Sequence, residues 1–529
     1  MLRRRVEAAF ARAEALLPRA EFPRARRRLD EIRAGLDARL RVAVVGRVSA
    51  GKSTLVNALL GEDRAPTGVT ELTFNVTRLH HAPRETLTVH YRDGRPSGPA
   101  DPARLRELAA RAHDDPDRLA ELRAVDWLDM GSPNAWLARF DLVDTPGLDS
   151  YAGEDSARTL RFLGRTGRDV HTATVEHASR ADALVMVFAS GLARSEELLL
   201  AETAGAGVAA GPLTAVGALT KTELYWPACP DPMAEGRRVA DRIMAAAGGR
   251  RVLFELRPLA GLLAAGAAAC TDQDVADLTV LSRTAPEALE ARVRRGPLFA
   301  SRPYPDLPVP AERRAGLLRR FGGWGLVLAC GLVRDGLTGR EALRDELLRR
   351  SGVAGFRDLL TEHFGNRADV VKLDAALREA RGLADLAGPD GDPRTRWRLR
   401  EAAGAVTGLA VAEHAFRELA LLRAAYDGAV PLTPPELAEV LRVTGEHGLA
   451  PAARLGLPPG APRPGLTARA AERQAYWAAV DLDPARGPAV AEAARVVRRS
   501  YDLLLDRIDR QLPVPDGADG ADWMDGAGR

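Results

Sequence analysis

The first half of the chain contains short apolar runs separated by polar, Gly-rich and helical segments. Apolar runs of about four to eight residues, rich in Val and Leu, are typical of strands buried in a parallel sheet. Apolar residues with helical spacing follow the first run, in LVNALLG at 55–61. The alternation predicts an α/β domain over about residues 41–270. Its expected strands lie at 41–45, 140–143, 182–189, 213–219 and 251–256.

The second half, from about residue 271, shows long amphipathic patterns and no convincing strand alternation. Residues 1–40 have similar helical spacing, broken near Pro18 and Pro23. Segments rich in Pro and Gly divide the second half at 301–310, 387–394 and 456–465. We therefore expect a helical segment at 1–40, a helical bundle or stalk at 271–390, a C-terminal helical region at 391–510 and a disordered tail at 511–529.

Composition narrows the class of protein only slightly. The 529 residues are 46% hydrophobic and 28% charged, with a formal net charge of +3. These values exclude a mostly disordered chain and give no electrostatic case for nucleic-acid binding. The three cysteines lie far apart and predict neither a disulfide framework nor a zinc site.

The sequence gives no sign of a targeting or membrane-spanning segment. The N-terminus lacks the features of a secretory signal, and no stretch reaches the roughly 18 consecutive apolar residues that would predict a spanning helix. We expect a cytoplasmic protein with at most peripheral membrane contact.

Two of the three lysines in the chain stand in nucleotide-binding motifs. Lys52 lies in GRVSAGKST, between the strand at 41–45 and a helix, which is the pattern GxxxxGK[ST] in its required context. Backbone N–H groups of such a loop turn toward phosphate oxygens, and the helix N-terminus adds its positive dipole end. Lys52 is expected to reach the β- and γ-phosphates, and Ser53 to ligate Mg²⁺. The expected nucleotide-binding residues of this loop are Gly46, Arg47, Val48, Ser49, Ala50, Gly51, Lys52, Ser53 and Thr54.

A second motif, Asp144-Thr145-Pro146-Gly147, follows the strand at 140–143. DxxG after a strand is the turn with which GTPases sense Mg²⁺ and the γ-phosphate. Asp144 is expected to bind the metal through water, and the Gly147 N–H to face the γ-phosphate. A threonine between the two motifs must complete the Mg²⁺ shell. Thr70 and Thr73 are the candidates, while Thr67 has the character of a turn residue.

The third motif, Thr220-Lys221-Thr222-Glu223, follows the expected strand at 213–219. GTPases read guanine with [NT]KxD, whose acidic residue accepts hydrogen bonds from the base and whose lysine packs over it. Here Glu223 replaces the aspartate and keeps a carboxylate that is one methylene longer. We interpret Thr220, Lys221 and Glu223 as the base-reading residues, and an ATPase stays an alternative because of Glu223.

These motifs, in this order, resemble the bacterial dynamin-like GTPases, and especially their actinobacterial, isoniazid-inducible group. The matching segments are GRVSAGKSTLVNALLG, APTGVTELTFNVTRL, SPNAWLARFDLVDTPGLDS, ADALVMVFASG and LRPLAGLLAAGA. The resemblance covers about residues 41–270 and implies an α/β P-loop GTPase domain, with a mostly parallel, doubly wound sheet, followed by a large all-α helical bundle. It implies GTP and GDP as ligands, with Mg²⁺, and hydrolysis of GTP as the activity.

The resemblance also assigns roles to single residues. It places Thr73 at the position of the catalytic threonine, which with Ser53 and Asp144 would complete the metal site. Ser49 would hold a monovalent cation that acts in place of an arginine finger. The water-orienting glutamine of dynamins is replaced by Val48, so we expect slow basal hydrolysis. Ser49, Lys52 and Thr73 are therefore the expected catalytic residues.

Partners follow from the same resemblance. It implies a homodimer, or a hetero-pair with another dynamin-like protein, through the GTPase domain, often at the inner face of the plasma membrane. It also implies that the helical segment 1–40 packs on the bundle. Residues 1–41 carry twelve arginines and six acids, a net charge of +6, and a basic helix of this kind suits either an anionic membrane or a solvated face.

Two further interpretations remain open at this stage. The segment Phe321–Leu332 is apolar and suits a membrane-inserting tip, although a buried core helix is the commoner meaning of such a run.

The function is interpreted as GTP hydrolysis coupled to self- or hetero-association and to membrane binding or remodelling. The alternative is a nucleotide-gated protein scaffold that does not bind lipid. A ribosome-assembly GTPase is disfavoured by the lack of a basic RNA-binding module.

Overall fold

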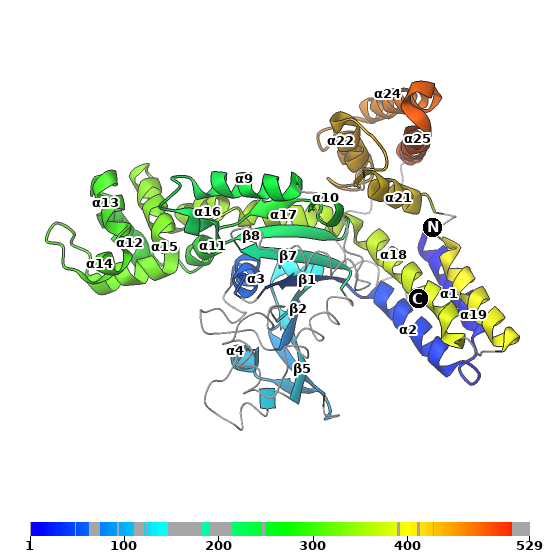
Figure 1. The fold of residues 1–529 in the computed structure, drawn as a ribbon, viewed down its shortest axis with the longest axis horizontal. Coiled ribbons are helices and arrows are strands. Elements are labelled where there is room, and N and C mark those ends of the chain that lie inside the picture. Colours follow the sequence, from blue (N-terminus) through cyan, green and yellow to red (C-terminus); the bar gives the residue numbers. More distant parts are fainter. Residues whose placement is uncertain are drawn as a thin grey trace. The chain divides into compact units, whose positions relative to one another are not determined.

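The computed structural model divides the chain into two compact units. One unit comprises Arg41–Leu360 and is called the sheet unit, and the other comprises Met1–Leu40 with Thr361–Arg529 and is called the helical unit. Both units contain helices, and the strands drawn as arrows belong to the sheet unit (Figure 1). The residues that the structure describes are 2–47, 49–62, 75–92, 95–109, 121–122, 124–146, 181–189, 213–245, 249–388, 392–409, 413–426 and 428–509.

The sheet unit is built on a nine-stranded sheet with the order β4-β3-β5-β2-β6-β1-β7-β8-β9. Parallel pairing joins β1 to β7, β7 to β8, β8 to β9 and β2 to β5. Antiparallel pairing joins β2 to β6, β3 to β5 and β3 to β4. The strands are β1 (Leu40–Gly46), β2 (Val76–His81), β3 (Thr86–Tyr91), β4 (Gly98–Ala100), β5 (Val125–Ser132), β6 (Phe140–Asp144), β7 (Ala183–Ala189), β8 (Ala215–Thr220) and β9 (Leu256–Pro258).

The central strands are buried nearly end to end, which explains why they are continuous apolar runs rather than alternating ones. Val45, Met186 and Phe188 belong to one core cluster with residues of β8 and α9. The expected strands at 41–45, 140–143, 182–189 and 213–219 correspond to β1, β6, β7 and β8. The prediction of a mostly parallel α/β sheet followed by a helical region is confirmed.

One local prediction was wrong. The run at 251–256 is not a strand, because a helical turn, α10 (Gly249–Val252), occupies its start and β9 begins only at Leu256. Leu253 and Leu256 pack over Gly217 of β8, and a short apolar run has the same letters in either conformation. Gly98–Ala100, for which the sequence pattern predicts no strand, pairs with β3 as the edge strand β4.

Helices of the sheet unit continue well past the expected domain boundary at 270. Leu263 and Ala267 of α11 share a core cluster with Leu278, Leu317 and Phe321, so α11–α15 pack as one body with the sheet rather than as a separate stalk. The helices are α3 (Lys52–Leu60), α4 (Leu105–Ala109), α9 (Pro232–Ala245), α10, α11 (Gly261–Ala268), α12 (Asp272–Leu281), α13 (Pro286–Val293), α14 (Gly296–Ser301), α15 (Ala311–Arg334), α16 (Arg340–Arg350) and α17 (Val353–His363).

Helix α15 contains the apolar segment Phe321–Leu332. By length and composition it is long enough and apolar enough to cross a membrane, and 44% of its most apolar window is buried inside the protein. Phe321, Leu326 and Ala329 are fully buried in the core of the sheet unit. The segment therefore serves as a core helix, as most runs of this kind do.

The helical unit joins both ends of the chain. Phe10, Leu17 and Leu29 of its first two helices share a core with Leu377 and Ala402. The Pro/Gly-rich segment 301–310 directly precedes α15, and the segment 456–465 leads into the start of α24. The helices are α1 (Leu2–Leu16), α2 (Pro23–Asp37), α18 (Ala368–Arg381), α19 (Pro393–Thr407), α21 (His414–Tyr426), α22 (Pro434–Val443), α23 (Pro451–Leu455), α24 (Arg463–Leu482) and α25 (Gly487–Asp509).

The expected boundary at 390 also falls inside a continuous core, because α18, the 3₁₀ segment η5 (Gly382–Ala387) and α19 pack together with α1 and α2. We call α1, α2, η5, α18 and α19 the bundle. The tail expected at 511–529 lies outside the described residues.

Candidate nucleotide-binding site

The loop between β1 and α3 has the backbone that its glycines predict. A Cβ on Gly46 would lie 2.5 Å from the carbonyl oxygen of Val187 on β7, so only glycine fits there. Gly51 has φ +91° and directly precedes α3, and Ser49 also lies in the left-handed region at φ 57°. These residues turn the chain sharply from the strand into the helix, so that the start of α3 faces the carboxyl edge of the sheet.

Lys52 is the first residue of α3, and its side chain is buried, with 6% exposure. The Nζ atom donates hydrogen bonds to the carbonyl oxygens of Gly46 at 3.2 Å and Arg47 at 2.8 Å. Burial lowers the pKa of Lys52 to about 8, and the nearby Asp144 carboxylate opposes that shift. A buried ammonium group at this position can bind phosphate oxygens with little competition from water.

Ser53 and Asp144 come from α3 and the end of β6. The Ser53 hydroxyl donates a hydrogen bond to Oδ2 of Asp144 at 2.9 Å, whereas Oδ1 of Asp144 is buried and has no hydrogen-bond partner among the described residues. Burial raises the pKa of Asp144 to about 6, against the attraction of Lys52 and the Ser53 hydrogen bond. An oxygen-only pair with an unsatisfied buried carboxylate oxygen fits Mg²⁺, which keeps waters and phosphate oxygens as its other ligands.

The residues that follow Asp144 are only partly described. The Thr145 hydroxyl donates to the carbonyl oxygen of Val44 at 2.7 Å, which fixes the end of β6 against β1. Val48, Thr73 and Gly147 lie outside the described residues, as do the other threonine candidates, Thr67 and Thr70. Their predicted roles therefore stay predictions.

The base-reading motif lies at the end of β8, and Lys221 begins the 3₁₀ segment η3 (Thr222–Tyr225) with φ 60°. The Thr220 hydroxyl lies 2.5 Å from the carbonyl oxygen of Ala50 and 3.0 Å from that of Phe188. Thr220 therefore ties the phosphate-binding loop to β7, a positioning role that the sequence did not suggest. Its hydroxyl is occupied by backbone carbonyls rather than pointing freely toward a ligand.

Glu223 is held by a residue that sequence analysis missed. Its Oε1 accepts a hydrogen bond of 3.1 Å from the backbone N–H of Leu262 in the first turn of α11, while Oε2 is buried without a partner among the described residues. Burial raises the pKa of the Glu223 carboxyl, and hydrogen bonds from its own N–H and that of Leu262 oppose the shift. The unsatisfied oxygen suits the N–H donors on the guanine edge. The segment LRPLAGLLAAGA was the only signal, and it carries no recognisable ligand type.

The structure thus brings together most of the predicted residues at one edge of the sheet. Gly46, Ala50, Gly51, Lys52 and Ser53 meet Asp144 from β6 and Thr220 from β8 through the contacts above. Thr54 lies next to Gly261 at the start of α11, where an added Cβ would come within 3.3 Å of its methyl group. Arg47 is partly exposed on the loop, and Ser49 is exposed. Ligands bind at this edge in open parallel sheets.

Comparison with known proteins agrees with this geometry. Residues 42–204 match the dynamin family. The isoniazid-induced protein IniC of Mycobacterium tuberculosis is 31% identical over 478 residues, which cover 90% of this chain and 92% of IniC. The chain belongs to the bacterial dynamin-like family. The expected family resemblance is therefore confirmed over nearly the whole chain, beyond the range 41–270 that its motifs covered.

Other similarities are shorter or more distant. Dynamin-like protein 2 of Campylobacter jejuni is 31% identical over 152 residues, which cover 29% of this chain and 24% of that protein. A solved structure of an oligomerised bacterial dynamin pair that senses and tethers membranes aligns over 92% of this chain and 87% of its own, with 12% identity and a TM-score of 0.30. As a member of the family, this bacterial dynamin-like chain is a GTPase that binds GTP and GDP with Mg²⁺.

Proposed function

We propose that this dynamin-like GTPase uses GTP binding and hydrolysis to control two kinds of association. One is with a second dynamin-like subunit, identical or different, and the other is with an anionic membrane surface. The observation that supports the nucleotide site is the contact between Ser53 and Asp144 beside the buried Lys52. These groups come from two segments far apart in the chain, and their chemistry is that of a metal–phosphate site.

In the proposed site each described residue has a separate task. The Lys52 ammonium would bind the β- and γ-phosphate oxygens, and the Ser53 hydroxyl would bind Mg²⁺ in place of its bond to Asp144. Asp144 would hold the metal through water. Bound Mg²⁺ would supply charge that balances the phosphates and the negative charge that develops during transfer. Thr73 would complete the metal shell, and the Gly147 N–H would sense the γ-phosphate, so that its loss releases the segment after residue 147.

The water-activating step is where this chain departs from dynamins. Val48 has no group that can hold the attacking water, so we propose that basal hydrolysis is slow. Ser49 is proposed to hold a monovalent cation near the β–γ bridge, where the cation would take the role of an arginine finger. Arg47 is the other cationic group on the loop, and we propose that it stays a solvated side chain.

The test is GTP turnover per molecule over a range of protein concentrations, with and without anionic liposomes. A specific activity that rises with concentration, and rises further with liposomes, supports association coupled to hydrolysis at a membrane. A rate that depends on concentration alone would leave subunit association standing and remove the membrane. A flat rate under every condition, with GTP still bound, would contradict both parts of the proposal.

The second candidate function is a nucleotide-gated scaffold that binds protein partners without lipid. The observation that favours it is the burial of Phe321, Leu326 and Ala329 in the core of the sheet unit. Because these side chains are already packed inside the protein, they do not serve as a membrane anchor. Activity that responds to a protein partner, but not to vesicles of any composition, would support this candidate over the first.

A further inference from the structure

One end of the bundle combines free arginines with exposed apolar side chains. The turn between α1 and α2 meets the start of α19 there, because Arg398 forms an ion pair with Glu21 at 2.5 Å and lies over the ring of Phe22. Arg24 of α2 and Leu386 of η5 line the same groove at this end. We call this end the bundle tip and define it by Arg24, Arg27, Leu386, Arg394 and Trp397.

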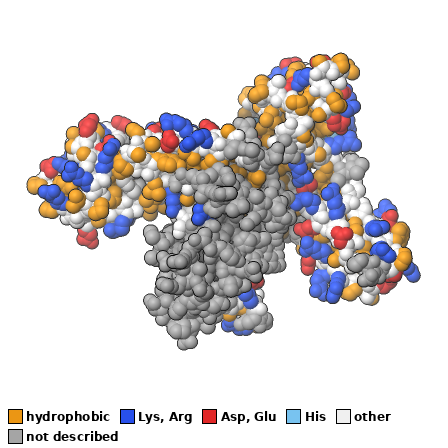
Figure 2. Space-filling model, viewed as in Figure 1, with side chains coloured by type: hydrophobic (Ala, Val, Ile, Leu, Met, Phe, Trp, Pro, Cys, Tyr) orange, Lys and Arg blue, Asp and Glu red, His pale blue; other side chains and the backbone are white. Residues whose placement is uncertain are grey.

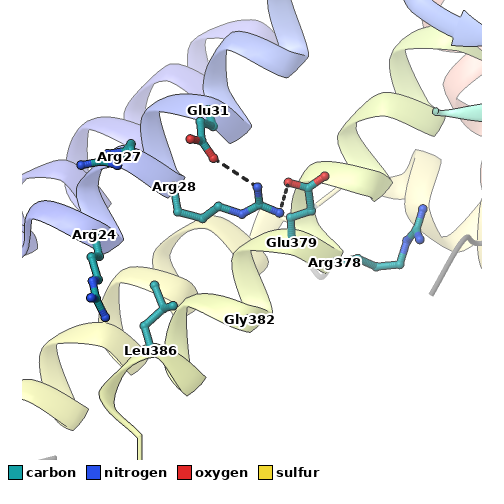
Figure 3. A pocket seen from close by; sticks show the side chains of 8 residues that line it. All are labelled: Arg24, Arg27, Arg28, Glu31, Arg378, Glu379, Gly382 and Leu386. Carbon is teal, nitrogen blue, oxygen red and sulfur yellow. Dashed lines mark hydrogen bonds and ion pairs between the residues drawn. The ribbon is translucent and has the colours of Figure 1, made fainter. Parts of the chain in front are cut away.

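The groove at the bundle tip has a volume of about 440 Å³ and lies between α2 and α18 with η5 (Figure 3). Within it Arg28 is neutralised, since its guanidinium pairs with Glu31 at 3.2 Å and with Glu379 at 3.0 Å. Arg378 is also engaged, through an ion pair with Asp374 at 3.1 Å. Arg24 and Arg27 differ from these two: neither side chain pairs with a carboxylate in the described parts of the chain.

The acidic residues around the bundle tip do not cancel these charges. Glu21 is paired with Arg398, and Asp30 is paired with Arg19 at 2.8 Å. Asp392 accepts hydrogen bonds from the backbone N–H groups of Arg394 and Thr395 as the cap of α19. Among the described residues around the bundle tip, Asp385 and Asp392 are the acids without an ion pair, against the three guanidinium groups of Arg24, Arg27 and Arg394, which have none either. Figure 2 shows basic side chains spread over the surface of the bundle.

Two large apolar side chains are exposed at the same end. Leu386 is 49% exposed and Trp397 is 57% exposed, and both belong to the small set of large apolar side chains that are exposed among the described residues. Arg398, the neighbour of Trp397, is the residue that joins α19 to the turn between α1 and α2. Exposed tryptophan next to unpaired arginine is the combination that suits the interface of a bilayer, where an amphipathic ring and a headgroup phosphate lie at similar depth.

We propose that the bundle tip is the surface with which this protein binds anionic phospholipid. Arg24, Arg27 and Arg394 bind headgroup phosphates, and Trp397 and Leu386 enter the headgroup boundary. The inference rests on the membrane association proposed above and specifies where it occurs. It assigns a role to the basic N-terminal helices and gives none to α15, whose Phe321, Leu326 and Ala329 are already buried in the core of the sheet unit.

The experiment is flotation of the full-length chain with vesicles of phosphatidylcholine alone and vesicles that also contain phosphatidylglycerol. Each basic side chain near an anionic leaflet raises membrane affinity roughly fivefold, so the double variant Arg24→Ala, Arg27→Ala should bind about 25-fold more weakly. The matched control is Arg283→Ala, Arg295→Ala, which removes two exposed arginines of the sheet unit that also have no ion pair among the described residues.

A second arm tests the apolar part. Trp397→Ser and Leu386→Ser should weaken binding, whereas Leu482→Ser, which removes a leucine that is 80% exposed on α24, should not. Addition of free glycerol phosphate distinguishes a membrane surface from a site for soluble phosphate. Failure to displace the vesicles supports the proposal, and full displacement contradicts it.

The outcomes separate this inference from the proposed function. Loss of flotation in the tip variants, with unchanged GTP turnover in the absence of lipid, supports both. Unchanged flotation of all tip variants would overturn the bundle tip while leaving membrane association standing. If the unmodified chain floats with no vesicle in any nucleotide state, membrane association itself fails, and the bundle tip fails with it.

Discussion

Lys52 and Lys372 are both buried lysines with contrasting roles, and they make a matched pair for a first prediction. Lys52→Ala should abolish GTP binding, since the phosphates lose their buried cation, while the fold survives. Lys372 is 7% exposed and donates to the carbonyl oxygens of Leu36, at 2.5 Å, and Ala38 within the helical unit. Lys372→Ala should lower thermal stability and leave GTP affinity unchanged. Isothermal titration calorimetry and circular dichroism measure the two effects.

Unchanged GTP affinity in the Lys52→Ala variant would show that α3 does not begin a phosphate-binding site. Loss of affinity in both lysine variants would mean that the effect reports general destabilisation.

Glu223 offers a second prediction at the residue scale. Glu223→Ala should lower GTP affinity by about 10- to 100-fold, as expected for the loss of one or two charge-assisted hydrogen bonds, and should leave the much weaker ATP affinity nearly unchanged. The carboxylate reaches the base from a position fixed by the Leu262 N–H, so Glu223→Asp loses that contact and should also weaken GTP binding.

Competition of GTP, ITP and ATP against a fluorescent GTP analogue checks this prediction. Glu472→Ala, which removes an exposed carboxylate of the helical unit, is the control. Equal losses of GTP and ATP affinity in Glu223→Ala would mean that Glu223 does not read the base.

Residue-level roles could be predicted where a short motif carries them, and not where they depend on contacts between distant segments. Lys52, Ser53 and Asp144 were predicted from motif spacing, and the structure places the Ser53 hydroxyl against Asp144, with the buried Lys52 beside them. The hydrogen bond from Thr220 to Ala50 joins residues 170 positions apart. The bond from Leu262 to Glu223 uses a backbone N–H, which every residue type except proline carries. No pattern of side-chain types indicates either contact.

At the scale of elements, α22 is joined to α24 and α25 by buried carboxylates. Glu439 accepts hydrogen bonds from Arg473, Trp477 and Tyr501. Glu436, one turn earlier, accepts from Arg486 and Tyr476 and closes a capping box with Thr433. Each of the two carboxylates therefore holds a helix pair together as well as satisfying its own buried oxygens.

The third prediction concerns the pH dependence of this cluster. Burial raises the pKa of Glu436, but hydrogen bonds from Thr433, Arg486 and Tyr476 outweigh burial and hold its pKa at about 2, below the ordinary 4.5. The ionised carboxylate therefore stabilises the fold at neutral pH. That contribution is fully present above about pH 4.5 and is lost as the pH falls toward 2.

Glu436→Gln should lower the local free energy of unfolding by about 2 kcal/mol at pH 7, since a hydrogen bond to a charged group is lost. The difference from the unmodified chain should shrink between pH 4.5 and 2. Hydrogen exchange followed by mass spectrometry over α22 and α24 measures both effects. A difference that stays constant over this pH range would exclude the carboxylate charge as its source.

The accuracy of the predicted elements depended on burial. Strands β1, β6, β7 and β8 are covered on both faces, so their sequences are uninterrupted apolar runs and were identified. Strand β4 has three residues, Gly98–Ala100, that include a proline and form an edge by backbone pairing with β3. Backbone pairing leaves little trace in side-chain types, which is why the sequence predicts no strand for this segment.

For the whole molecule, the division into two compact units leads to the fourth prediction. The nucleotide site lies within the sheet unit, so a saturating concentration of GTP with Mg²⁺ should stabilise that unit by about 2.7 kcal/mol at 100 times the dissociation constant. The helical unit gains nothing directly. Hydrogen exchange should slow in α3, β6 and α11 and stay unchanged in α18, α19 and α25.

The Lys52→Ala variant, mixed with the same nucleotide, is the control for this prediction. Equal protection of both units on GTP binding would contradict independent stabilisation and would show that the units unfold as one.

Domain boundaries were the least predictable feature of the chain. Sequence composition changes near 270, where strands end, but packing does not. The apolar faces of α12 and α15 have α11 as their partner, so the compact unit runs to Leu360. Amphipathic patterns show that a helix has an apolar face without showing which element covers it.

In the sequence, one part of the helical unit precedes the sheet unit and the other part follows it. This order has a consequence for synthesis on the ribosome. Helices α1 and α2 emerge first, yet their apolar residues Phe10, Leu17 and Leu29 are covered by α18 and α19, which follow after Ala368. At translation rates of roughly 5–20 residues per second the wait is on the order of 20–70 s. During that time the nascent chain exposes an unfinished core to chaperones, while the nucleotide-binding unit can already complete its own.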